Sequence, residues 1–125
     1  MTTHHQKKIA GIWLDSAKAM IIAQDEKGEF IIFNNLKGRE NHSGGNEHTI
    51  NNAKKSEELK YFKSVSALLL PYDEILIFGP GTAQEQLQHH LKETVQFNDK
   101  KVTIDSAPQM TDNQAIAWVR EFFKS

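Results

Sequence analysis

The sequence predicts an α/β fold in which a mixed five-stranded sheet carries helices on both faces. Three short apolar segments near the N-terminus are separated by turn residues, which is typical of an antiparallel meander. A segment with helical spacing follows. Apolar runs of strand length then alternate with two further helical segments, which is typical of parallel strands joined through helices. The predicted order of elements is therefore βββαβαβα.

The meander comes first. Its first strand covers residues 9–14, Ile-Ala-Gly-Ile-Trp-Leu, and stops at Asp15, whose side chain favours a turn because it can accept hydrogen bonds from nearby backbone amides. The second strand covers residues 17–23. Gly28 closes the next turn, since glycine adopts a positive φ without a Cβ clash. Residues 29–34 form the third strand, and the short turns make all three antiparallel neighbours.

A polar segment, residues 36–52, contains three glycines and almost no apolar side chain. It predicts a long exposed loop, and the polar residues 1–7 predict a disordered tail. From Ala53 the apolar residues recur with helical spacing, and Pro71 ends that helix. The apolar stripe consists of Leu59, Phe62, Val65 or Ser66, and Leu69.

Two further strands and two helices complete the chain. Residues 74–78, Glu-Ile-Leu-Ile-Phe, form a continuous apolar run typical of a strand covered on both faces. After the turn at residues 79–81, the pattern from Thr82 to Glu85 predicts a capping box and a helix to about residue 95. Residues 101–105 form the fifth strand, and a second capping box, Thr111 to Gln114, begins the last helix. Its apolar face holds Ile116, Val119, Phe122 and Phe123.

This order of elements matches the ribonuclease H-like topology, although other α/β orders stay open. In that topology the first and fourth strands run parallel side by side. Open α/β sheets bind ligands in the crevice beyond the carboxyl ends of such strands. We therefore expect Asp15 to meet the Gly79–Thr82 turn there, with Asp105 nearby.

The composition limits the function classes. A chain of 125 residues with 38% hydrophobic positions suits one compact domain. The absence of cysteine excludes disulfides, zinc ribbons and cysteine nucleophiles. The net charge of -1 lacks the basic excess of a dedicated nucleic-acid binder. No apolar run approaches the ~18 residues of a membrane span, so we expect a cytoplasmic protein without a membrane partner.

Two groups of residues suggest chemistry. Asp15, Asp105 and one of Glu57 or Glu58 are the carboxylates available to a two-metal nuclease, whose divalent ions need several such ligands. Turn capping is the other role open to Asp15. The turn with Gly79, Gly81 and Thr82 opens a helix, whose free amides can hold an anion. A tight connection from strand to helix explains the same residues, and we expect no resident metal or cofactor.

The pair Gly44-Gly45, followed by Asn46 in the long polar loop, is explained less readily by a structural role, because a glycine backbone can enter a tight site. Five segments form a pattern over about residues 8 to 123: residues 9–15, residues 37–39 leading to Gly44-Gly45-Asn46, residues 58–65, residues 75–81 and residues 113–116. Together they resemble the middle domain of the eukaryotic and archaeal class-1 peptide release factors and of Pelota, with their short bacterial relatives. The resemblance implies a free-standing domain of this type.

In those release factors the loop after the third strand carries Gly-Gly-Gln, which promotes hydrolysis of peptidyl-tRNA in the ribosome. This chain has Gly44, Gly45 and Asn46 at that place. Asparagine is one methylene shorter than glutamine, and a misplaced catalytic group can cost about a hundredfold in rate. The resemblance therefore implies binding rather than hydrolysis.

The resemblance predicts translation-associated binding to the ribosome or to tRNA. The contacting loop is Gly44 to Asn46, and the phosphate contacts implied are Lys37, Arg39, Lys54 and Lys55. Two alternatives from other classes remain. One is a metal-dependent nuclease or phosphohydrolase that uses Asp15, Asp105 and Glu58. The other is a small adaptor without catalysis that acts as a homodimer.

Overall fold

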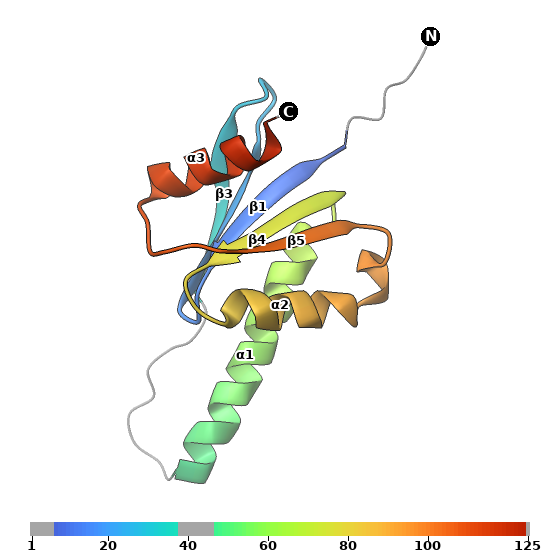
Figure 1. Cartoon of the computed structure of the whole chain (residues 1–125). Helices are drawn as coiled ribbons and strands as arrows, with labels where there is room; N and C mark the ends of the chain where they lie inside the picture. Colours follow the sequence, from blue (N-terminus) through green and yellow to red (C-terminus); the bar gives the residue numbers. More distant parts are fainter. Residues whose placement is uncertain (1–6, 38–46, 125) are drawn as a thin grey trace.

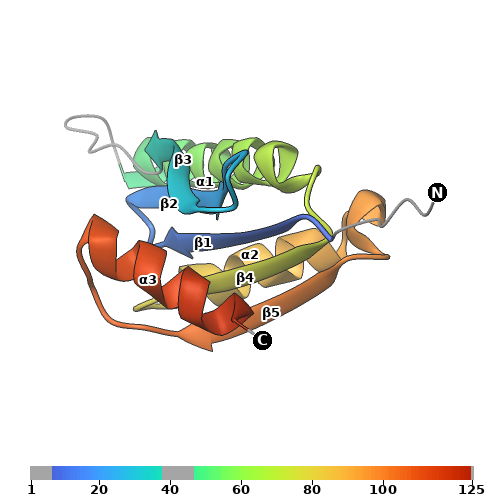
Figure 2. The same ribbon diagram turned by 90° about the horizontal axis from the view of Figure 1, so that it is seen from above.

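The computed structural model describes residues 7–37 and 47–124, with side chains in the second range from residue 58 onward. One sheet forms the central layer, with α3 on one face and α1 and α2 on the other (Figure 1, Figure 2). The elements are β1 (Ile9–Leu14), β2 (Lys18–Gln24), β3 (Phe30–Lys37), α1 (Glu47–Leu69), β4 (Glu74–Gly79), α2 (Ala83–Lys92), the 3-10 turn η1 (Val95–Phe97), β5 (Lys101–Ser106) and α3 (Asp112–Phe123).

The strand order in the sheet is β3-β2-β1-β4-β5. The pairs β1–β2 and β2–β3 are antiparallel, because short turns join these strands. The pairs β1–β4 and β4–β5 are parallel, because each return passes through a helix. The predicted fold class, with its mixed five-stranded sheet and helices on both faces, is confirmed.

A bulge in β3 sets the register of its pairing with β2. Ile22 lies opposite Ile32, but the next residue of β2, Ile21, lies opposite Asn34. Phe33 is therefore the extra residue, and its side chain is 47% exposed. Beyond the bulge every pair is shifted by one position, which places Lys18 opposite Lys37.

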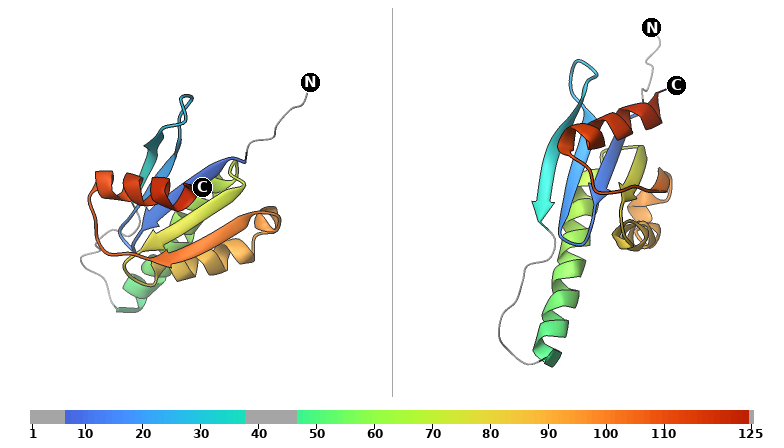
Figure 3. Two further views of the ribbon diagram at one scale, coloured as in Figure 1. Left: turned by 45° about the horizontal axis from the view of Figure 1, so that its top comes forward. Right: turned by 60° about the vertical axis from the view of Figure 1, so that its left-hand side comes forward.

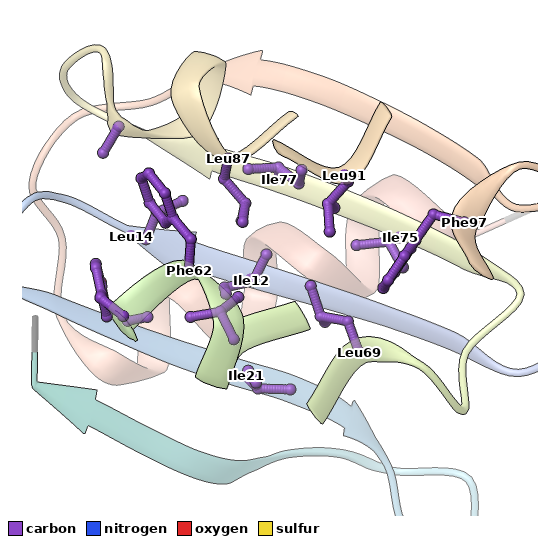
Figure 4. Close-up of a cluster of buried hydrophobic side chains, with 14 residues drawn as sticks. Ile12, Leu14, Ile21, Phe62, Leu69, Ile75, Ile77, Leu87, Leu91 and Phe97 are labelled. Carbon is purple, nitrogen blue, oxygen red and sulfur yellow. The ribbon is translucent and has the colours of Figure 1, made fainter. Parts of the chain in front are cut away.

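Successive side chains of a strand point to opposite faces of the sheet, so the strands contribute to two hydrophobic clusters, one on each face. On one face, Phe62 and Leu69 of α1 and Leu87 and Leu91 of α2 pack on β1 and β4 (Figure 4). On the other face, α3 covers β1 and β3, as Figure 3 shows from two further directions. The second cluster contains Trp13, Met20, Ile22, Leu76, Phe78, Ala107, Ala115 and Val119. Residues of β1 and β4 are buried on both faces, as the continuous apolar run in β4 predicts.

The structure corrects the bounds of the predicted loop. Residues 36–52 were expected to be loop, but β3 extends to Lys37 and α1 already begins at Glu47. The first turns of α1 project beyond the sheet (Figure 1, Figure 3), so nothing there requires an apolar stripe. The apolar spacing therefore begins several residues after the helix does. Leu59 was expected on the buried stripe and is instead 48% exposed.

One of the two predicted capping boxes is confirmed. The Thr111 hydroxyl accepts a hydrogen bond from the Gln114 backbone at 3.2 Å, and the Gln114 side chain accepts one from the Thr111 backbone at 2.8 Å. The box at Thr82 was predicted wrongly, because its side chain makes no capping bond. Thr82 has φ -102° and ψ -4°, whereas a capping residue needs the extended backbone that Thr111 has.

The helices of residues 47–69, 83–92 and 112–123 are all too short or too polar to cross a membrane.

Candidate functional site

The carboxyl ends of β1, β3, β4 and β5 lie at one edge of the sheet, because these four strands run in the same direction. Trp13 of β1 pairs with Phe78 of β4, and Phe78 pairs with Asp105 of β5. Asp15, the turn after Gly79, and Asp105 therefore follow one another along this edge. Lys37 ends β3 at the same edge, on the other side of β1. We call this region the carboxyl edge.

Asp15 holds the turn between β1 and β2. Its Oδ1 atom accepts hydrogen bonds from the backbone amides of Ala17 at 2.8 Å and Lys18 at 2.9 Å. Its Oδ2 atom accepts one from Gln109 Nε2 at 3.3 Å, which ties the turn to the segment before α3. Both carboxylate oxygens thus have structural partners, in the turn-capping role that the sequence left open.

Tyr61 of α1 reaches the same turn. Its hydroxyl donates a hydrogen bond to the Asp15 backbone carbonyl at 3.1 Å, and its ring is almost fully buried. Burial and, second, the negative charge of Asp15 raise the pKa of Tyr61 well above its usual value of 10.0. The phenol therefore remains a protonated donor and fastens α1 to the end of β1.

Replacing Tyr61 by phenylalanine should cost about 1 kcal/mol at neutral pH, the usual contribution of one hydrogen bond. The substitution should also flatten the alkaline loss of stability. The tyrosine ionises in the unfolded chain near pH 10 and in the folded chain only at higher pH. Its contribution is therefore complete below about pH 10 and falls as the pH rises further. Urea unfolding at pH 7 and about pH 11 measures both effects.

The matched control is Tyr72→Phe, since burial also raises the pKa of Tyr72. That variant should keep the alkaline decline that Tyr61 causes. An equally steep decline in the Tyr61→Phe variant and in the parent protein would contradict the assignment.

The turn after β4 serves the packing of the edge. The Gly79 carbonyl accepts hydrogen bonds from the buried Gln84 side chain at 3.0 Å and from the Ala107 backbone at 2.9 Å. A Cβ atom on Gly79 would lie 2.1 Å from the Leu14 carbonyl oxygen, whereas one on Gly81 would meet nothing within 4 Å. Gly79 is thus required for the close approach of β4 to β1. Thr82 is exposed and makes no capping bond.

The carboxylates predicted as metal ligands lie on different elements: Asp15 follows β1, Asp105 belongs to β5 and Glu58 belongs to α1. Asp105 is exposed, and its Oδ1 atom accepts a hydrogen bond from the Ser106 amide at 2.9 Å. Glu58 is exposed on α1. In the described ranges, no three His, Asp or Glu side chains lie close enough together to hold a metal ion.

Two lysines form the basic side of the carboxyl edge. Lys18 and Lys37 are exposed and lie directly opposite each other on β2 and β3, so their side chains share one face. Lys18 Nζ lies 5.4 Å from the centre of the Trp13 ring. Lys18 was missing from the predicted contacts, because counting back from the turn at Gly28 without the bulge would pair it with Leu36.

The other residues predicted to contact RNA belong to the segment between β3 and α1 or to the first turns of α1. Gly44, Gly45, Asn46 and Arg39 fall outside the described residues. Lys54 and Lys55 belong to the backbone of α1, but their side chains are outside the described part. The described ends that flank the loop are Lys37 and Glu47, and Lys37 stands at the carboxyl edge.

Comparison with solved structures identifies proteins of the same fold. Pelota from Archaeoglobus fulgidus superposes with a TM-score of 0.64 at 12% identity, over 95% of this chain and 32% of that one. Pelota from Thermoplasma acidophilum gives 0.59 at 20% identity, over 95% and 32%. The archaeal translation termination factor aRF1 gives 0.57 at 14% identity, over 91% and 34%.

The resemblance in fold to the middle domain of the release factors and Pelota is thereby confirmed. The chain spans about a third of the length of these proteins. The sequence itself matches no family model and no curated protein. The likeness therefore establishes the architecture of this chain, which it shares with about a third of Pelota and of aRF1.

Proposed function

We propose that this protein binds RNA of the translation machinery, in the ribosome or in tRNA, through the loop that joins β3 to α1. Gly44, Gly45 and Asn46 would be the contacting residues of that loop. The fold likeness to Pelota and to the termination factor aRF1 is the observation that carries the proposal. The proposal is binding without hydrolysis of peptidyl-tRNA, because Asn46 is one methylene shorter than the glutamine that the resemblance implies.

The charges at the carboxyl edge support this proposal. Like charges directly opposite each other on neighbouring strands destabilise a sheet, and Lys18 and Lys37 are such a pair. A phosphate placed between the two ammonium groups would remove this repulsion. Lys37 is also the last described residue before the loop, so the basic pair lies where the loop departs from the sheet. Arg39, Lys54 and Lys55 are proposed as further phosphate contacts, as the sequence predicts.

The net charge of -1 is compatible with this reading only if the positive charge is locally concentrated. Lys18 and Lys37 lie toward β2 and β3, while Asp105 lies on β5 at the opposite side of the sheet. The Asp15 carboxylate lies between them, and its two oxygens accept hydrogen bonds from backbone amides of its own turn and from Gln109. An RNA phosphate would therefore approach from the β3 side.

Neutralising both lysines tests the proposal. The Lys18→Gln/Lys37→Gln variant should sediment with ribosomes less than the parent protein does. The slope of log affinity against log salt should fall in magnitude by about two, one for each lost phosphate contact. Folding stability should change by less than about 1 kcal/mol, because the lost cation–π contact of Lys18 with Trp13 and the relieved repulsion offset each other. Sucrose-gradient sedimentation across a salt series and urea unfolding measure the two quantities.

The matched control is Lys27→Gln/Lys124→Gln, which changes the net charge equally at exposed positions away from the edge. It should leave the salt slope unchanged. Absence of the parent protein from every ribosomal fraction at low and moderate salt would overturn the proposal. An equal loss of binding in both variants would assign the effect to net charge alone.

A further inference from the structure

The outer edge of β5 pairs with no other strand of the described ranges, and its backbone groups alternate between facing β4 and facing outward. β5 is the last strand of the sheet (Figure 2), and in the described ranges it pairs only with β4. The Lys101 amide donates to Asp73 and the Ala107 amide donates to Gly79, so the odd-numbered amides of β5 face β4. The amides of Val102 and Ile104 therefore face outward, since successive residues alternate.

We propose that a second copy of this chain pairs with this edge, so that two β5 strands run antiparallel about a twofold axis at Thr103. In this register Val102 of each copy lies opposite Ile104 of the other. Both residues present free amides and carbonyls outward, so they form hydrogen-bonded pairs. The five-stranded sheets of the two copies then join into one continuous sheet. The proposal goes beyond RNA binding and does not depend on it.

The charges along β5 complement themselves in this register and in no neighbouring one. Lys101 of each copy lies directly opposite Asp105 of the other, with both side chains on the face that carries α3. Opposite charges in such cross-strand positions stabilise a pair of strands, and like charges destabilise it. Among the described residues of its own chain, Lys101 Nζ lies within ion-pair distance of the Glu74 carboxylate alone, at 3.8 Å. Both ion pairs between the copies belong to the same register, so a displacement by two residues would remove both of them.

A groove beside β5 is suited to receive the incoming lysine. It has a volume of about 620 Å³ and runs between the end of β5 and α3. Asp105 and Glu121 are its charged lining residues, and no basic side chain of the described ranges lines it. Trp118 and Phe122 form much of its apolar wall. The aliphatic stem of Lys101 from the second copy would lie on this wall, with its ammonium group at the carboxylates. The second copy therefore completes the groove with the charge that it lacks.

Light scattering on nuclease-treated protein, free of RNA that could bridge two copies, tests the proposal first. The parent protein should give a mass near twice the 14.2 kDa of the chain at high concentration. The Ile104→Pro variant should remain monomeric, because proline removes an outward amide and leaves the pairing with β4 intact. Ile104→Val keeps that amide and should dimerise as the parent does.

Charge reversal tests the register itself. Lys101→Asp and Asp105→Lys should each weaken self-association at least about tenfold, because each homodimer then holds two like-charge pairs. An equimolar mixture of the two variants should recover a dimer, since both cross-strand pairs are again of opposite sign in the mixed species. Circular dichroism verifies that each variant is folded before mixing.

A parent protein that stays monomeric at its highest soluble concentration would overturn the proposal. Dimers that survive Ile104→Pro would do the same, since they would place the interface elsewhere. A mixture that associates no better than the separate variants would exclude this register.

Discussion

Replacing Gly79 by alanine is expected to destabilise the protein by about 3 kcal/mol, a cost at the upper end for an added methyl group in a tightly packed site. The new Cβ atom would lie 2.1 Å from the Leu14 backbone carbonyl oxygen and 3.3 Å from Gln84 Oε1. Neither group can move away from the new methyl group without losing other contacts. Leu14 ends β1, which is paired on both sides, and the Gln84 side chain is buried and bonded to the Gly79 carbonyl.

Gly81→Ala provides the matched control, two residues further along the same turn. No atom lies within 4 Å of a Cβ built there, so the expected change is small. Alanine can even stabilise such a site by about 0.5 kcal/mol by restricting the unfolded chain. Urea unfolding of both variants gives the comparison. Equal stability of the two would show that β4 does not require its close approach to β1.

Replacing Leu69 by alanine is expected to cost about 3 kcal/mol, the usual result for a leucine removed from a close-packed core. Leu69 is fully buried and contributes to the cluster of α1 and α2 on the sheet (Figure 4). Removing the side chain leaves a cavity. The helix α1 cannot move to close it, because Tyr61, Phe62 and Val65 also pack on the sheet.

Leu59→Ala makes the same chemical change on the same helix, at a side chain that is 48% exposed. Its cost should stay below about 1 kcal/mol, because half of the leucine surface is already in water. Thermal unfolding of the two variants separates the positions clearly. A cost for Leu59→Ala equal to that of Leu69→Ala would place Leu59 in a contact beyond the described chain.

Much of the fold follows from local sequence. β1 was predicted at residues 9–14 and has these bounds, because an apolar run closed by a turn-forming aspartate needs no distant information. Thr111 caps α3 as its four-residue pattern predicts. The same pattern at Thr82 fails, since the tight turn from Gly79 to Gly81 holds Thr82 in a helical backbone conformation. The capping pattern thus predicts where a helix begins more reliably than it predicts that the capping hydrogen bond forms.

The start of α1 was beyond sequence reasoning for a different reason. Apolar spacing marks the part of a helix that packs on something, and the first turns of α1 lie beyond the end of the sheet (Figure 1). The helix continues there because hydrogen bonds within its own backbone suffice once the packed part has formed. The segment predicted to be loop therefore overlaps the end of β3 and the first turns of α1.

The sequence by itself determined the kinds of elements, their order and the resemblance to the release-factor middle domain, because these depend on residues close together in the chain. Only the tertiary structure decided how the carboxyl edge is used. The bulge at Phe33 moves Lys37 opposite Lys18, and Gln109 reaches Asp15 across the sheet. Both contacts join residues far apart in sequence. Their register and distance are set by strand pairing and packing, which local spacing does not encode.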